Sequence, residues 1–202
     1  MHTLFLASKS SSRKKLLHQA NIPFAIIDQQ ADESFVDWQQ PLDQLVTAIA
    51  RHKMEQLMIP PGTHDGQYAF IITADTMSQH ADGTVNGKPK NRADAHEKIK
   101  KARQGNRLCT AFCLDKRIWH DGQWHLERRI ERCVKATLFY DVPDELIDYY
   151  LDHSHALSAS GAIAVEDFGL QFLKSVTGSY TAIIGLPLFE LRQELMALGF
   201  FS

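Results

Sequence analysis

The sequence has few cysteines and no long apolar run, and both absences narrow the kinds of protein that it can encode. Three cysteines occur among 202 residues, none of them in a C-x-x-C pair, so a disulfide framework is not expected. The longest apolar runs, such as "YAFII" at 68–72, are too short to span a bilayer. The start "MHTLFLASKSS" lacks the basic and apolar regions of a signal peptide. We therefore expect a cytoplasmic protein without membrane contact.

The chain also lacks a strong net charge. Its 22 Lys and Arg residues nearly balance its 24 Asp and Glu residues, which gives a formal charge of −2. No global field therefore favours nucleic acid, and any binding of an anion has to be local. A hydrophobic content of 44% and a charged content of 23% are typical of a globular protein. We find no internal repeat or linker, so we expect a single domain over 1–202.

The hydrophobic pattern alternates short strands with helices. Strands are expected at 3–7, 23–28 and 68–76, and as two long strands on either side of Asp121-Gly122. Helices are expected at 11–21, 42–58, 91–105 and 142–154. The last segment, 169–200, is expected to form a strand, a tight turn and a final helix. This order predicts a mixed α/β fold with antiparallel pairing in the second half.

The stretch "LASKSSSRKKLL" (6–17) places a serine-rich turn between a strand and a helix start. Backbone N–H groups and the helix dipole favour an anion at such a turn, and Arg13 can add a two-point contact to a phosphate. The alternative is an ordinary solvated helix start. Lys15 is expected to be solvated under either interpretation.

Acidic residues stand at the ends of two of the expected strands. Asp75 comes at the expected end of a buried strand, and Asp32 and Glu33 follow another strand. Carboxylates at strand ends are candidates for binding Mg²⁺ or for activating a water molecule. The alternatives are a turn cap for Asp75 and a solvated acidic loop for Glu33.

Two lysines are further candidates. Lys53 falls within the apolar stripe of the helix at 42–58, where its stem packs and its ammonium reaches either solvent or a cleft. Lys88 lies in "GTVNGKP", which is not a P-loop because Pro89 replaces the metal-binding Ser or Thr. It is either a turn lysine or a point charge for a phosphate. Together, these cations and carboxylates favour phosphate-ester or anhydride chemistry with a metal.

These segments resemble the Maf proteins, nucleoside triphosphate pyrophosphatases that share a fold with the inosine triphosphatase group. The resemblance rests on "LASKSSSRKKLL", "DESF", Lys53 in "AIARHKMEQL", "ITADT", "GKP", "SGAIAVED" and "GSYTAIIGLPLFEL", in this order along nearly the whole chain. It implies a twisted mixed sheet flanked by helices, with two lobes around a cleft, and a homodimer. It also implies hydrolysis between the α- and β-phosphates with Mg²⁺ or Mn²⁺.

The resemblance assigns roles to the flagged residues. Metal binding falls to Glu33 and Asp75, and catalysis to these two carboxylates with Lys53 and Lys88. Substrate contacts are implied for a set spread along the chain, namely Ser8, Ser10, Arg13, Lys14, Thr76 and Glu166.

The chain also departs from the family pattern. Ser11 and Ser12 stand where the family usually has Pro and then Arg or an aromatic residue, and Glu166 stands where Gln is common. A carboxylate cannot donate a hydrogen bond as an amide does. The selected base is therefore left open. A second hypothesis is a nucleotide-binding protein without catalysis that acts in cell-division control.

Overall fold

The computed structural model describes residues 2–31 and 39–202, and its centre is one mixed sheet. The strands are β1 (Leu4–Leu6), β2 (Phe24–Ile26), β3 (Tyr68–His80), β4 (Val85–Asn86), β5 (Asn106–His120), β6 (Gln123–Tyr140) and β7 (Leu173–Gly178). They lie in the order β2-β1-β3-β5-β6-β7, with β4 paired to β3. β1 is parallel to β2 and β3, and every other pairing is antiparallel. The predicted mixed α/β class is confirmed.

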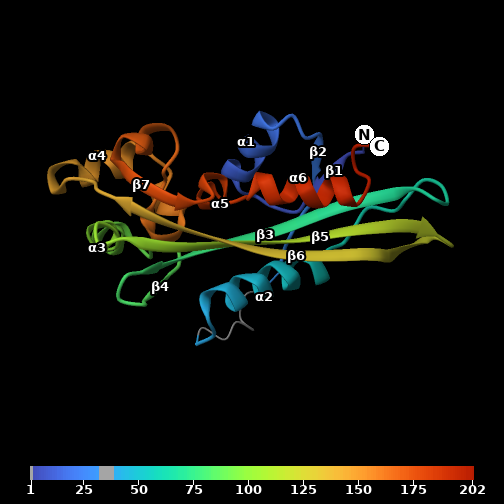
Figure 1. Ribbon diagram of the computed structural model, residues 1–202, viewed down its shortest axis with the longest axis horizontal. Coiled ribbons are helices and arrows are strands. Elements are labelled where there is room, and N and C mark those ends of the chain that lie inside the picture. The colour runs from blue at the N-terminus through green and yellow to red at the C-terminus, as the bar shows by residue number, and fades with distance from the viewer. Residues whose placement is uncertain (1, 32–38) are drawn as a thin grey trace.

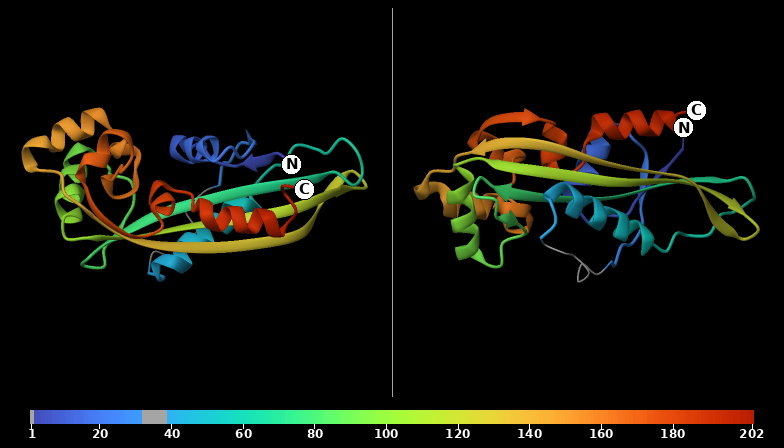
Figure 2. Two further views of the ribbon diagram at one scale, coloured as in Figure 1. Left: turned by 45° about the horizontal axis from the view of Figure 1, so that its top comes forward. Right: turned by 60° about the horizontal axis from the view of Figure 1, so that its bottom comes forward.

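Helices cover both faces of this sheet (Figure 1). They are α1 (Ser11–Gln19), α2 (Leu42–Glu55), α3 (Arg92–Ala102), α4 (Ile147–His153), α5 (Tyr180–Ile184) and α6 (Leu188–Ala197). Short 3-10 turns lie at Asp144–Leu146, Ala156–Ser158, Ser160–Ala162 and Asp167–Phe172. α1 and α6 lie over one face and α2 over the other, while α3, α4 and β7 gather at one end (Figures 1 and 2). None of the helices in the described part of the chain is both long and apolar enough to cross a bilayer.

The central strand β3 is buried on both faces, which explains its unbroken apolar run. Phe70 and Ile72 pack in the cluster that contains residues of α1 and α6. The alternate residues Ala69 and Ile71 pack in the cluster beneath α2. Because successive side chains of a strand point to opposite faces, one strand serves both hydrophobic cores.

The long hairpin of β5 and β6 agrees with the sequence pattern. Its two connecting residues, Asp121 and Gly122, have φ angles of 50° and 74°. A two-residue hairpin turn of this kind requires the left-handed region, which Asp and Gly tolerate. The tip of this hairpin projects at the end of the molecule opposite α3 and α4 (Figures 1 and 2).

Several predicted element bounds were wrong. β3 continues to His80 because Ser78 and Gln79 pair with β4 and the whole strand pairs with β5. Asp75 therefore lies within a strand rather than at its end. The expected single final helix is two helices, since Gly185, with φ 128°, separates α5 from α6.

Candidate active site

The serine-rich turn after β1 is closed by its own side chains. Ser10 caps α1, and its Oγ accepts a hydrogen bond from the backbone N–H of Arg13 at 3.3 Å. Ser8, which is only 6% exposed, accepts one at Oγ from the N–H of Ser10 at 3.2 Å. An N-cap serine of this kind satisfies a donor that the first helical turn leaves unpaired. The turn therefore has a fixed shape beside the end of β1.

Arg13 joins three separate segments of the chain. Its Nε donates to the carbonyl oxygen of Gly185 at 2.8 Å, while Nη1 and Nη2 donate to the hydroxyls of Ser8 and Thr76, each at 3.2 Å. Burial lowers the pKa of Arg13, and the negative charge of Asp75 acts in the opposite direction. Because a guanidinium stays charged in proteins, this side chain places a fixed positive charge near Asp75.

Lys53 and Asp75 form a largely buried ion pair. The Nζ of Lys53 lies 2.6 Å from Oδ1 of Asp75, and the side chains are 12% and 13% exposed. The hydroxyl of Thr73 donates to the backbone oxygen of Ala50 at 2.6 Å, which ties α2 to β3 one helical turn before Lys53. The ammonium of Lys53 thus contacts the carboxylate of Asp75 across the packing of α2 on β3.

Asp75 still lies at the edge where parallel strands end. β1 pairs with β3 only as far as Leu6 opposite Ile72, and the N–H of Ala7 donates to the oxygen of Ile72 at 3.0 Å. Among the described residues, β3 then has no strand partner on this side until Ser78, where its pairing with β4 begins. Asp75 was expected at the end of its own strand; it lies instead within β3, three residues beyond the last β3 residue that pairs with β1.

The hydroxyl of Thr76 also contacts the neighbouring strand β5 and, through it, α5. It lies 2.9 Å from the hydroxyl of Thr110, which donates to the backbone oxygen of Ala182 at 2.6 Å. Thr110 and Gly185 are positioning residues that the sequence reasoning missed. A polar residue inside the apolar run "RLCTAFCL" was the available signal for Thr110.

Glu166 contacts the segment "LASKSSSRKKLL" (6–17) through Ser12. Its Oε1 accepts a hydrogen bond from the hydroxyl of Ser12 at 2.6 Å and lies 3.5 Å from Nε2 of His155. The next residue, Asp167, lies 2.5 Å from the ammonium of Lys15. The expectation that Lys15 is merely solvated is wrong, because Asp167 turns toward α1.

Lys14 and Lys88 are not brought into this network. The side chain of Lys88 is exposed and that of Lys14 is half-buried, and neither makes a hydrogen bond or ion pair with another residue of the described ranges. The loop before α3 that carries Lys88 is nevertheless anchored. Ser160 Oγ donates to the oxygen of Asn86 at 2.6 Å, and the N–H of Gly161 donates to that of Gly87 at 3.1 Å.

The described part of this centre offers a divalent cation one carboxylate, that of Asp75. Mg²⁺ is commonly held by one or two carboxylates together with phosphate oxygens of the substrate, and Asp75 supplies one buried carboxylate. Glu33, the other expected ligand, lies outside the described residues. Within those residues, three potential ligands converge only at Asp65, His120 and Asp121, all of them exposed. That cluster lies at the hairpin tip and is not the expected site.

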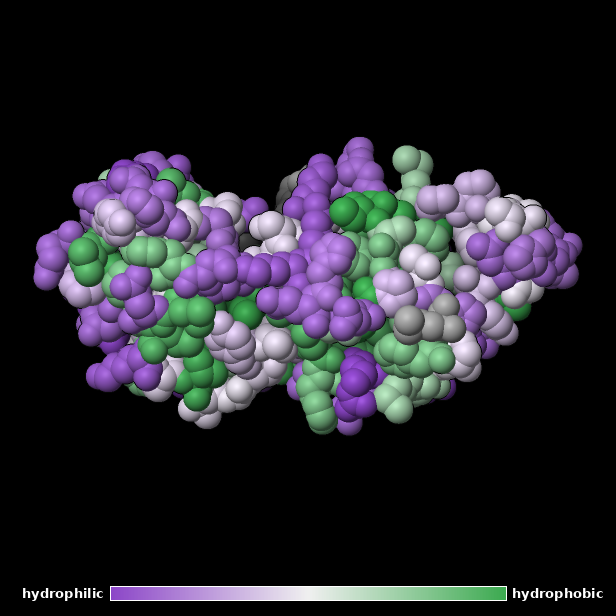
Figure 3. All heavy atoms as spheres, turned by 90° about the horizontal axis from the view of Figure 1, so that it is seen from above, coloured by the Kyte–Doolittle hydropathy of each residue, from purple (hydrophilic) through white to green (hydrophobic). Residues whose placement is uncertain are grey.

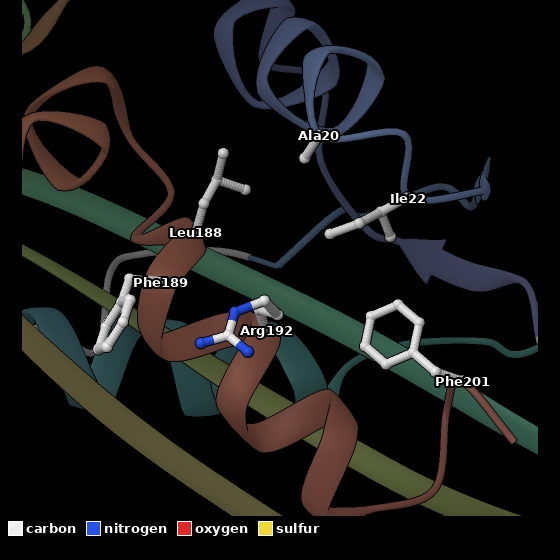
Figure 4. A pocket seen from close by; sticks show the side chains of 6 residues that line it. All are labelled: Ala20, Ile22, Leu188, Phe189, Arg192 and Phe201. Atoms are coloured by element: carbon white, nitrogen blue, oxygen red, sulfur yellow. The ribbon is translucent and has the colours of Figure 1, made fainter.

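The face of the molecule that carries α1 and α6 mixes hydrophilic and hydrophobic side chains (Figure 3). On the face that carries α1, polar side chains border an indentation between the α3–α4 end and the central part (Figure 3). A separate hollow of about 350 Å³ lies between the end of α1, α6 and the C-terminus, and Figure 4 shows its lining, in which Arg192 is the one charged residue. None of the expected site residues within the described ranges lines that hollow, so we do not assign the chemistry to it.

Known proteins are similar to this chain over nearly its whole length. A family model described as Maf-like protein matches residues 3–198. The dTTP/UTP pyrophosphatase of Halalkalibacterium halodurans is 30% identical, over 99% of this chain and 98% of that protein. Those of Bacteroides fragilis and Fusobacterium nucleatum are 30% and 26% identical, each over 98% of this chain and 96% of the relative.

Proposed function

Because the chain belongs to the Maf-like protein family, we propose that it is a nucleoside triphosphate pyrophosphatase. It hydrolyses the bond between the α- and β-phosphates and releases a nucleoside monophosphate and pyrophosphate. The observation that carries this proposal is the buried pair of Lys53 and Asp75 beside the fixed guanidinium of Arg13. A carboxylate among cations is the arrangement that a hydrolase of a polyanion needs.

The cations of the site bind and orient the triphosphate. Arg13 is held by its contacts so that its charge can compensate the phosphates without reorganising. Ser8 and Ser10 shape the turn before α1, where backbone N–H groups favour an anion. Lys53 adds a second positive charge from the opposite face of the sheet, and Lys88 supplies a third from its anchored loop.

Asp75 serves the reacting end of the substrate. We propose that it holds a divalent cation, Mg²⁺ or Mn²⁺, together with phosphate oxygens and Glu33. A bound cation of this kind acts as a Lewis acid on the phosphoryl oxygens. The carboxylate of Asp75 accepts hydrogen bonds only, so it orients an attacking water while Lys53 fixes its direction.

The competing hypothesis, nucleotide binding without hydrolysis, accounts less well for Asp75. A protein that only binds a triphosphate can use Asp75 as a metal ligand, but it has no use for a carboxylate that orients a water molecule. Burying an ion pair also costs desolvation that a pure binding site can avoid. The site is therefore better explained by catalysis.

The test is pyrophosphate release from a panel of common and modified triphosphates with Mg²⁺ or Mn²⁺. Turnover that is abolished by a chelator and restored by the metal supports the proposal. Tight triphosphate binding by calorimetry without any turnover would instead support the binding hypothesis.

We also propose that residues 1–202 act as one domain, that the protein is a homodimer and that it works in the cytoplasm. The resemblance to the family supports these proposals. Size-exclusion chromatography with light scattering tests the dimer, since a monomer mass at micromolar concentration would contradict it.

A further inference from the structure

Two of the three cysteines lie diagonally across neighbouring strands, on the same face of the sheet. In the pairing of β5 with β6, Cys109 is opposite Lys135, and Ala111 is opposite Cys133. Cys133 is therefore two positions along β6 from the residue opposite Cys109, and both cysteines pack in the cluster beneath α2. The two thiols reach each other and share a hydrogen bond.

The two thiols of this pair are not equivalent. Cys109 is only 4% exposed, whereas Cys133 is half-buried. Their shared hydrogen bond lowers the pKa of Cys133 and raises the pKa of Cys109, so the thiolate of the pair forms on Cys133. A thiolate that solvent can reach is the reactive form of cysteine. Cys133 is thus placed as the attacking thiol and Cys109 as its neighbour.

The third cysteine differs from this pair. Cys113 lies on the same face of β5, opposite Glu131. Its side chain is fully buried, and this burial raises its pKa to about 12. A buried neutral thiol reacts slowly with oxidants. Cys113 is therefore the matched control within the same strand.

A disulfide between Cys109 and Cys133 would strain the two strands. Diagonal neighbours of an antiparallel pair lie about 7–8 Å apart, whereas a disulfide joins Cα atoms at most about 7 Å apart. Closing the bond would therefore shift the backbone of β5 and β6 locally. Strained disulfides are the more easily reduced ones, which suits a reversible modification better than a permanent crosslink.

Thr110 connects this position to the candidate active site. It directly follows Cys109 in β5, and its side chain points to the opposite face of the sheet. There its hydroxyl lies 2.9 Å from that of Thr76 and donates to the oxygen of Ala182 at 2.6 Å. Thr76 in turn accepts a hydrogen bond from Arg13 at 3.2 Å. A shift of the backbone at Cys109 would therefore displace contacts that position Arg13.

We propose that Cys133 and Cys109 are a reversible redox pair whose oxidation by a peroxide lowers the activity of the enzyme. The thiolate of Cys133 attacks one oxygen of hydrogen peroxide, which breaks the O–O bond, leaves a sulfenic acid and releases hydroxide. The sulfur of Cys109 then displaces the sulfenic hydroxyl, which leaves as water with the proton of the Cys109 thiol. A dithiol reductant returns the two electrons and restores both thiols. The effect on activity rests on the proposed function, whereas the disulfide does not.

The first test identifies the linked cysteines in the full folded chain after treatment with hydrogen peroxide. Because Cys109 and Cys113 share the tryptic peptide 108–116, peptide mapping by mass spectrometry uses both the wild type and Cys113→Ala. Both should lose two hydrogen atoms and show a link to Cys133, which dithiothreitol removes. Cys133→Ser should show no link. A link that involves Cys113, oxidation to sulfinic acid without a link, or no oxidation at all overturns the proposal.

The second test measures kcat/KM for a triphosphate before and after oxidation. The oxidised wild type should lose at least about 10-fold, since a displacement of 1 Å at a site can cost about 100-fold, and dithiothreitol should restore the rate. Cys113→Ala should respond as the wild type does, whereas Cys133→Ser should keep its rate in peroxide. An equal loss in Cys133→Ser, or a disulfide without a loss of rate, rejects the regulatory role. If no triphosphate is hydrolysed before oxidation, the proposed function fails, while the peptide map still decides whether the pair forms.

Discussion

The pair of Lys53 and Asp75 should make a stability contribution that can be separated from its contribution to activity. Asp75→Asn removes the carboxylate charge that pairs with the ammonium of Lys53 at 2.6 Å, and Lys53→Met removes the ammonium. Breaking a buried ion pair costs about 3–5 kcal/mol. Because 12% and 13% of the two side chains remain exposed, we expect the lower end, about 3 kcal/mol for each variant.

The double variant should be less destabilised than the sum of the two single variants, because both members of the 2.6 Å contact are removed together. We expect a coupling free energy of about 2–3 kcal/mol in the double-mutant cycle. Each single variant should lower the melting temperature by roughly 6–12 °C. Urea unfolding at pH 7.5 measures the free energies, and calorimetry measures the melting temperatures.

Activity should follow a different pattern. Each single variant should lower the rate of pyrophosphate release by about 100-fold or more. The double variant should lose less stability than the sum of the two single-variant losses, but its rate of pyrophosphate release should stay as low as theirs. Additive stability effects, or a full rate in either single variant, would refute the reasoning. The control is Glu131→Gln, because Glu131 pairs with Arg51 of α2 at the same 2.6 Å but with Arg51 49% exposed. It should cost less than about 1 kcal/mol.

Three further predictions follow from other contacts. Arg13→Lys removes the guanidinium that donates hydrogen bonds to Gly185 and Thr76 at the same time, so kcat/KM should fall about 100-fold. The control variant Arg192→Lys, on α6, should leave kcat/KM unchanged. Asp115→Asn removes a fully buried carboxylate that accepts hydrogen bonds from Arg117 and Arg129. The free energy of unfolding should fall by about 3 kcal/mol, with the rate per folded molecule retained. Burial lowers the pKa of His80 in the folded state, so the unfolded chain binds more protons at acidic pH. The free energy of unfolding should therefore decrease as the pH falls below about 6.5, by up to about 1.4 kcal/mol per pH unit. Parallel pH profiles of this free energy for the wild type and His80→Leu would contradict the prediction.

Much of the fold could be predicted because its signals are local. The Asp-Gly turn at 121–122 requires left-handed backbone, and it joined the two long strands as expected. The apolar stripe of α2 likewise predicted the buried face that packs under the sheet. The end of β3 could not be read in this way. Polar residues after Thr76 look like a turn, but Ser78 and Gln79 continue the strand because they pair with both β4 and β5.

The sequence by itself determined which residue types are available at the site and which elements carry them. The strand, serine turn and helix start around Arg13 follow from capping and periodicity, which act over a few residues. Only the tertiary structure decided which of these side chains meet. Lys53 faces Asp75 because α2 is tied across β3, and Ser12 meets Glu166 across 154 positions of sequence. Such contacts depend on how the helices lie on the sheet, and no local pattern encodes that arrangement.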